Sequence, residues 1–210
     1  IRIEAPLGCL LNAQRPAATA AGNVETSMRI VDVVLGALAQ AIPNKVPAAS
    51  QGTMNNVAMG SHQQPAWDYY ETLAGGMGAS LALPGLHVVQ SHMTNTLNTP
   101  IESLERHYPL RIREYSVRQG SGGQGAMPGG NGLVREFEFL APTEVTLLTE
   151  RRRHGPWGLA GGAAGACGRN WLDGLELPAK VHISVKAGQV LRIETPGGGG
   201  YGALPDSLLD

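Results

Sequence analysis

Apolar residues recur at helical spacing in one stretch near the start of the chain. They follow one another at steps of four, three, four, three and four residues: Val24, Met28, Val31, Leu35, Leu38 and Ile42. Such spacing puts them on one face of a helix. Asn23 is suited to cap its start, and Pro43 stops it. We therefore predict an amphipathic helix over residues 24–42, with Leu35 and Leu38 buried against a core.

Three charged residues of this helix, Glu25, Arg29 and Asp32, lie off the apolar stripe. Charged side chains opposite an apolar stripe usually face water, and an acid in the first turn also interacts favourably with the helix dipole. We expect a solvated or capping face for all three residues.

From residue 110 onward the pattern alternates with a period of two, as in half-buried strands. The segments with this pattern are 110–118, 133–140, 145–149, 181–186 and 190–195. Glycine-rich stretches separate them, and Ile1–Ile3 also has the composition of a short strand. The predicted fold class is α+β, with a mixed portion over residues 1–109 and a mostly β portion over residues 110–210.

Small polar side chains gather in the run from His92 to Thr99, which precedes a short predicted helix ended by Pro109. Asn and Thr compete for backbone hydrogen bonds, so the run favours a rigid loop. Two interpretations stay open: a loop that satisfies its own backbone, and a loop that lines a site or a subunit contact. For the second, His92, Asn95 and Asn98 are the candidate site residues, because an imidazole with a pKa of about 6.5 can transfer a proton near neutral pH.

A second polar run, residues 47–60, resembles the first in its density of amides and hydroxyls. The chain has 29 Gly and 14 Pro, which we interpret as many tight loops. The glycines of residues 74–78 lack the Lys-Ser/Thr ending of a phosphate-binding loop, so we assign them no nucleotide role.

Composition excludes several classes of function. A formal net charge of −1 over 210 residues gives no electrostatic reason to expect a nucleic-acid partner. No apolar run approaches the roughly 20 residues of a membrane span. With only two cysteines, Cys9 and Cys167, a secreted disulfide framework is not expected, and a cytoplasmic location is simplest. Because the sequence starts at Ile1 without Met, we expect it to be part of a longer polypeptide.

No catalytic motif is complete. HExxH, CxxC and GxSxG patterns are missing from the sequence, and with them the usual zinc and serine-nucleophile signatures. The basic run Arg151–Arg153 could hold an anionic intermediate. A solvated strand end or a subunit salt-bridge face is the favoured interpretation of this run.

Several long motifs resemble the hydantoinase B family, the B subunits of ATP-dependent N-methylhydantoinase and 5-oxoprolinase. They lie in residues 22–29, 47–56, 69–78, 92–111, 121–132, 150–162 and 194–202. The longest reads H-M-T-N-T-L-N-T-P-I-E-S-L-E-R-H-Y-P-L-R, and the last reads E-T-P-G-G-G-G-Y-G. The resemblance covers nearly the whole chain but only the C-terminal part of the longer family subunits.

The resemblance implies a function and partners. An ATPase-type A subunit, with ATP and magnesium, would phosphorylate the amide oxygen of a small cyclic amide. The B subunit would then help water to open the activated ring. The first alternative, within the family, is a subunit of an ATP-dependent ketone carboxylase of the acetone or acetophenone type, and the second is a noncatalytic assembly module. It implies contact with the remainder of the B subunit as well.

The resemblance also implies a divalent metal, held by a His/Asp cluster in the N-terminal part of the family subunits. That part is outside this sequence, so no residue here is assigned as a metal ligand or as a cofactor-binding residue. Cys167 stands where the family usually has proline, and a small buried residue is the simplest role for it.

Overall fold

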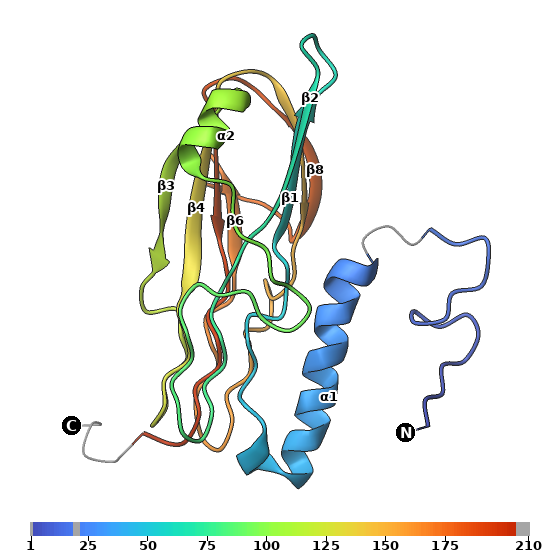
Figure 1. The fold of residues 1–210 in the computed structure, drawn as a ribbon, viewed down its shortest axis with the longest axis vertical. Coiled ribbons are helices and arrows are strands. Elements are labelled where there is room, and N and C mark those ends of the chain that lie inside the picture. The colour runs from blue at the N-terminus through green and yellow to red at the C-terminus, as the bar shows by residue number, and fades with distance from the viewer. Residues whose placement is uncertain (1, 19–21, 205–210) are drawn as a thin grey trace.

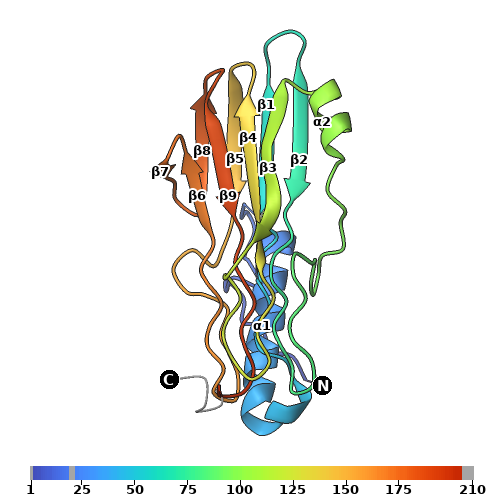
Figure 2. The same ribbon diagram turned by 90° about the vertical axis from the view of Figure 1, so that its left-hand side faces the viewer.

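Two antiparallel sheets packed face to face form one half of the molecule (Figures 1 and 2). The computed structural model describes residues 2–18 and 22–204. One sheet has the strand order β2-β1-β5-β8 and the other β3-β4-β9-β6-β7. Helix α2 lies at the edge of this sandwich, while α1 lies beside the other half of the molecule (Figure 1).

The elements have the following bounds. The first sheet contains β1 (Asn56–Ser61), β2 (Trp67–Thr72), β5 (Thr143–Leu148) and β8 (Lys180–Val185). The second contains β3 (Leu110–Arg118), β4 (Gly132–Phe139), β6 (Arg169–Leu172), β7 (Leu175–Glu176) and β9 (Val190–Glu194). A π-helical turn at Gly22–Thr26 leads into α1 (Ser27–Ala41), a 3₁₀ turn follows at Pro43–Lys45, and α2 spans Ile101–His107.

The core lies between the sheets and follows the period-two pattern of the strands. Phe137 and Phe139 of β4 point inward with Leu191 and Ile193 of β9, and Val145 faces them from β5. The alternation within β4 comes from Glu136 and Glu138, which are less buried than the phenylalanines between them. The predicted β-rich fold with an N-terminal helix is confirmed, because burying every second residue is what this pattern requires.

The strand predictions differ from the structure mainly in the first half of the chain. Strand β1 begins at Asn56, inside the run that the sequence suggested was a polar loop, and β6 and β7 were also missed. Arg2 and Ile3 are not in a strand, while Ile1 lies outside the described residues. The short helix predicted before Pro109 is present as α2, capped by Pro100 without a side-chain hydrogen bond.

The division at residue 109 remains a prediction, but the two portions are not separate in the sheet. Strand β1, from the first portion, pairs along its length with β5, from the second. The first sheet is therefore built from both portions.

The second half of the molecule is a bundle of extended glycine-rich segments below the sandwich in Figure 1. We call it the glycine bundle; it comprises residues 47–52, 74–79, 85–89, 121–131, 155–166 and 196–202. The segment 196–202 runs through its centre: the Gly198 N–H donates to Gly130 O at 2.8 Å, and Gly198 O accepts from the Gly123 N–H at 2.8 Å. The expectation of tight loops is wrong here, because the glycines let extended backbones approach one another.

Helix α1 turns its polar side, rather than its predicted apolar stripe, toward the rest of the molecule. Glu25 and Asp32 are buried, whereas Leu38 is 42% exposed. Of the six stripe residues, all within the described ranges, only Met28 is buried. The predicted solvated face and the predicted buried stripe are both wrong, because hydrogen-bonding groups of other segments meet the helix on its charged side. Asn23 lies within the π-helical turn and does not cap α1.

Candidate functional site

A cluster of charged and polar side chains lies where α1 meets the glycine bundle and the end of the first sheet. We call it the junction cluster; its members are Glu25, Arg29, Asp32, Thr53, Asn55, Asn56, His92, Arg151 and Arg152. They come from four separate stretches of the chain: the π-helical turn with the start of α1, the segment that leads into β1 together with its first residue, the loop before α2, and the segment after β5. The fold therefore brings the two polar runs of the sequence and the arginine run to one place.

Glu25 anchors one side of the junction cluster. Its Oε1 accepts hydrogen bonds from Thr53 Oγ1 at 3.0 Å, the Met54 N–H at 3.0 Å and Asn56 Nδ2 at 2.9 Å. Thr53 Oγ1 in turn accepts the N–H of Asn55 and that of Glu150, both at 3.1 Å. Burial raises the pKa of the Glu25 carboxyl, and the bonds from Thr53 and Met54 oppose that rise. The carboxyl is thus held rigidly in a setting that penalises its charge.

Asp32 anchors the other side, where two guanidinium groups share one carboxylate. Arg151 Nη2 donates to Asp32 Oδ2 at 2.6 Å, and Arg29 pairs with the same oxygen. Burial lowers the pKa of Arg29, helped by the neighbouring Arg151, and it also lowers the pKa of Arg151, in both cases to about 10. One acid therefore compensates two bases that have been removed from most of their water.

Arg152 ties this region to the second sheet. Its Nη1 donates to Asn55 Oδ1 and its Nη2 to Asn170 Oδ1, each at 2.8 Å. Burial lowers the pKa of Arg152 to about 9. Arg153 is exposed. The interpretation of the run as a solvated strand end is therefore wrong for Arg151 and Arg152, while a subunit salt-bridge face stays a prediction.

The backbone of the junction cluster adopts a rarely populated conformation at several positions. Asn55, His92 and Arg151 have φ values of 45°, 58° and 61°, and Gly52 beside them has 62°. A left-handed conformation is disfavoured for residues with a Cβ and persists only where the surrounding structure enforces it. Strained positions gather at functional sites, so their convergence here supports a functional role for the cluster.

Several buried polar atoms of the cluster make no hydrogen bond within the described residues. They are Glu25 Oε2, Asp32 Oδ1, Arg29 Nε, Arg151 Nε and Arg152 Nε. Buried polar groups are nearly always paired, so each such atom calls for an explanation. A cluster with free donors on three arginines can bind and orient a group that carries negative charge.

The three predicted site residues do not converge. The imidazole of His92 enters the junction cluster, with Nε2 3.5 Å from Asp32 Oδ1 and 13% of the side chain exposed. Burial lowers the pKa of His92, and Arg29 and Arg151 lower it further, which favours a neutral ring. Asn95 is exposed. Asn98 turns toward the sandwich, where Nδ2 donates to Thr72 O and Oδ1 accepts from the Tyr115 hydroxyl, each at 3.0 Å.

Asn98 borders a second buried charged pair, between the sheets. Arg135 of β4 is fully buried, 3.5 Å from the Glu71 carboxylate of β2, and its guanidinium lies 4.2 Å from the centre of the Tyr115 ring. Burial raises the pKa of Glu71, with Arg135 opposing the rise. Here Asn98 holds the loop against the sandwich, a positioning role that differs from the setting of His92.

Most of the junction cluster was not predicted from the sequence. Glu25, Asp32 and Arg151 were each recognised as charged, but the pattern gave them solvent-facing roles. The available signal was the polar run before β1, in which Gln51, Thr53, Asn55 and Asn56 are all buried. A run so rich in buried amides needs polar partners elsewhere in the chain.

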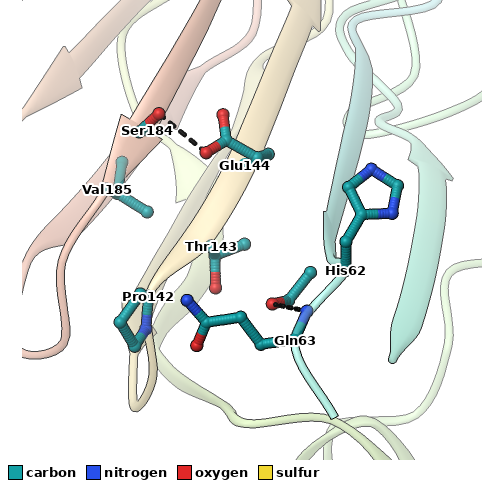
Figure 3. A pocket seen from close by; sticks show the side chains of 8 residues that line it. His62, Gln63, Pro142, Thr143, Glu144, Ser184 and Val185 are labelled. Carbon is teal, nitrogen blue, oxygen red and sulfur yellow. Dashed lines mark hydrogen bonds between the residues drawn. The ribbon is translucent and has the colours of Figure 1, made fainter. Parts of the chain in front are cut away.

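Two surface depressions differ in how close they come to the junction cluster, one at an end of the first sheet and one beside α1. One, of about 340 Å³, is at the end of the strands between the turn after β1 and the start of β5. Figure 3 shows its side chains, with Ser184 donating to Glu144 at 2.7 Å and the imidazole of His62 pointing away from that pair. The other, a groove of about 1000 Å³, runs between residues 8–18 and the start of α1 and reaches Glu25 and Arg29. Only the groove borders the junction cluster.

Within residues 2–18 and 22–204, no group of three His, Cys, Asp or Glu side chains lies close enough together to hold a metal ion. Across the same ranges, no helix is both long and apolar enough to cross a membrane.

Comparison with known proteins identifies the family. The family model described as hydantoinase B/oxoprolinase matches residues 1–204. The chain belongs to this family. It is 43% identical over 208 residues to 5-oxoprolinase 1 of Arabidopsis thaliana, a match that covers 97% of this chain and 16% of the plant protein.

Solved structures of two proteins share the fold. The crystal structure of the ATP-dependent caprolactamase from Pseudomonas jessenii superimposes with a TM-score of 0.84 at 27% identity, covering 99% of this chain and 39% of that one. A nucleotide-free acetone carboxylase gives a TM-score of 0.56 at 19% identity, over 79% of this chain and 28% of that one. The hydantoinase B-type chain described here thus spans well under half the length of the proteins it matches.

Proposed function

We propose that this chain is the C-terminal part of the B subunit of an ATP-dependent cyclic-amide hydrolase. Its role is to help open a ring that an ATPase-type A subunit has activated by phosphorylating the amide oxygen. The observation that carries the proposal is the family match over residues 1–204, together with the similarity to a 5-oxoprolinase and an ATP-dependent caprolactamase. All three names refer to cyclic amides or their hydrolysis.

The junction cluster gives the proposal its chemistry. Water adds to the carbon of the phosphorylated amide, and the ring opens when the C–N bond breaks and the nitrogen takes up a proton; the phosphoryl group, released later as phosphate, carries negative charge on its oxygens throughout. Fixed positive groups hold such charge best in a site that excludes water. Arg29 and Arg151 offer such groups, since their Nε atoms are buried and unpaired within the described residues. The neutral ring favoured for His92 is the form that can accept a proton from water.

A ketone carboxylase subunit is the alternative within the family. The similarity to acetone carboxylase favours it only at the level of the fold, because identity is 19%. The same positive groups would then hold a carboxylate or an enolate oxygen. A noncatalytic assembly module is the alternative from another class; in that case the cluster serves only to fix α1 against the glycine bundle.

The test uses the complete natural protein that contains residues 1–210, combined with its ATPase-type partner. ATP-dependent opening of 5-oxoproline, hydantoin and caprolactam is followed by product formation, with acetone plus bicarbonate as the carboxylase arm. Ring opening supports the proposal, and carboxylation without ring opening supports the alternative. We expect residues 1–210 alone to open no ring, because the ATPase is a separate partner in this scheme; turnover by that piece would contradict the assignment of roles.

A further inference from the structure

Helix α1 carries a second apolar stripe, on the side that faces away from the molecule. Its members follow helical spacing: Ile30, Val33, Val34, Ala37, Leu38 and Ala41. All six are exposed, and Val33 and Val34 are 71% and 51% exposed. A helix that places polar side chains inward and a continuous apolar stripe outward reverses the usual arrangement of a surface helix.

The stripe continues into the groove beside the helix. Ile30 lines that groove, and so do Leu10 and Leu11 of the segment that runs alongside α1 (Figure 1). Leu7 and Leu10 on this segment are 71% and 85% exposed. Contiguous exposed apolar surface of this kind marks an interaction site.

The chemistry of the stripe indicates a permanent partner. None of the six residues carries a charge, and surfaces that are apolar throughout belong to obligate interfaces, whereas transient ones are about as polar as the rest of a protein surface. The ties on the inner side of the helix support the same view. Glu25 and Asp32 fix α1 on the body of the molecule, so the stripe cannot reach the chain's own core by rotation of the helix.

We propose that the outward stripe of α1, with the groove beside it, is the docking surface for the remainder of the B-type subunit. The matched caprolactamase covers 99% of this chain while this chain covers 39% of it, so a protein of this type has ample further chain to cover the stripe. The identity of the occupant rests on the proposed function. The groove also reaches Glu25 and Arg29, so the docked part would close the open side of the junction cluster.

Cysteine labelling tests this docking directly. Val34→Cys and Ala37→Cys are made separately in the complete natural protein, purified without its ATPase partner, and reacted with a maleimide. The unmodified protein measures the background from Cys9, Cys167 and any other cysteine. Lys186→Cys, in the exposed turn after β8, is the control for an accessible site, and reaction in urea shows that each thiol is competent.

Both stripe cysteines should react at least about tenfold more slowly than Lys186→Cys, because a covered thiol reacts only when the contact opens. This protection should be the same at high and low protein concentration. Labelling as fast as the control overturns the proposal. Protection that disappears on dilution assigns the stripe to a second copy of the chain, and protection that appears only with the ATPase partner assigns it to that partner; either result overturns the occupant proposed here. The labelling assay involves no turnover. It can therefore contradict the docking proposal without contradicting the proposed function, and the ring-opening assay can contradict the function without contradicting the docking.

Discussion

The sandwich and the glycine bundle are two halves of one chain that are stabilised in different ways. In the sandwich, large side chains such as Phe137 and Leu191 fill the space between two sheets. In the bundle, residues 196–201 are all buried, yet most of them have no side chain to bury. There the contacts join backbone to backbone, as in the bonds of Gly198 to Gly123 and Gly130. The pattern of apolar and polar residues therefore predicts the core of the sandwich, but it contains no signal for the glycine bundle.

The difference predicts that one added methyl group harms the bundle more than several lost carbons harm the sandwich. A Cβ on Gly198 would lie 2.0 Å from Met77 O and 2.3 Å from Met77 C. Because the Met77 backbone cannot move away as a flexible side chain could, we expect Gly198→Ala to lower the free energy of unfolding by at least about 4 kcal/mol. Urea unfolding of the complete protein, followed by circular dichroism, measures the loss.

Gly36→Ala is the matched control for that substitution. Gly36 lies in α1, and a Cβ there would be 3.7 Å from the Trp157 ring, an ordinary contact. Alanine favours a helix over glycine by about 1 kcal/mol, so this variant should be slightly more stable than the natural protein. A loss of less than about 1 kcal/mol for Gly198→Ala would show that the bundle is not closely packed.

The sandwich should respond as an ordinary hydrophobic core. Leu191 is fully buried between the sheets, so Leu191→Ala should cost about 2–4 kcal/mol, from lost burial and the cavity left behind. Leu191→Met conserves volume and should cost less than about 1.5 kcal/mol. The same unfolding experiment ranks them with Gly198→Ala; a greater loss for Leu191→Ala than for Gly198→Ala would reverse the comparison.

The sequence predicted the sandwich better than the bundle for this reason. Strand β3 was predicted with its observed bounds, and β4, β8 and β9 within one residue at each end, because alternation of apolar and polar residues reflects burial on one face. Strand β1 was missed, because its residues and those before it carry amides that are buried by hydrogen bonding. The bundle was mistaken for tight loops. Glycine is used both at positive φ in turns and where two backbone segments approach closely, and the sequence alone does not distinguish the two uses.

Candidate site residues were predictable by type but not by position. The polar run around His92 was singled out as a candidate site, yet Asn98 and His92 lie in different surroundings. Glu25 and Asp32 were predicted to face solvent. Their burial depends on contacts with Thr53 and Arg151, which are distant from them in sequence. Helical periodicity describes one element and cannot report such partners.

Substitutions in the loop of residues 92–99 test whether this loop takes part in turnover. His92→Ala and Asn95→Ala should each lower turnover of the reconstituted enzyme at least about tenfold, equivalent to about 1.4 kcal/mol of barrier. Assembly should be little changed. Asn98→Ala is the comparison: it removes hydrogen bonds to Thr72 and Tyr115, so it should lower stability. If His92→Ala and Asn95→Ala both assemble and turn over normally, the loop is scaffold only.

The smallest expected effect is a change in how stability depends on pH. Burial raises the pKa of Glu25 above its ordinary value of 4.5, so the folded protein holds this proton more tightly than the unfolded chain. That contribution is fully present below pH 4.5 and is lost as pH rises through the raised pKa. Glu25→Gln removes the charge, so the variant should gain stability relative to the natural protein as pH rises above 4.5.

Glu114, on the outer face of the sandwich, should behave with the opposite sign. Its bonds with Ser116 and Arg192 lower the pKa of its carboxyl, so its contribution is present above the ordinary carboxyl pKa and is lost as pH falls through the lowered one. Glu114→Gln should therefore lose stability relative to the natural protein as pH rises through this range. Glu71 and His92 also titrate with shifted pKa values, but each variant is compared with the same natural protein, so their contributions cancel to first order. Unfolding measured from pH 2 to pH 8 gives both difference curves, with the Glu114 change expected below pH 4.5 and the Glu25 change above it. Curves of the same slope would contradict the assignment of Glu25 to a buried site and Glu114 to a surface ion pair.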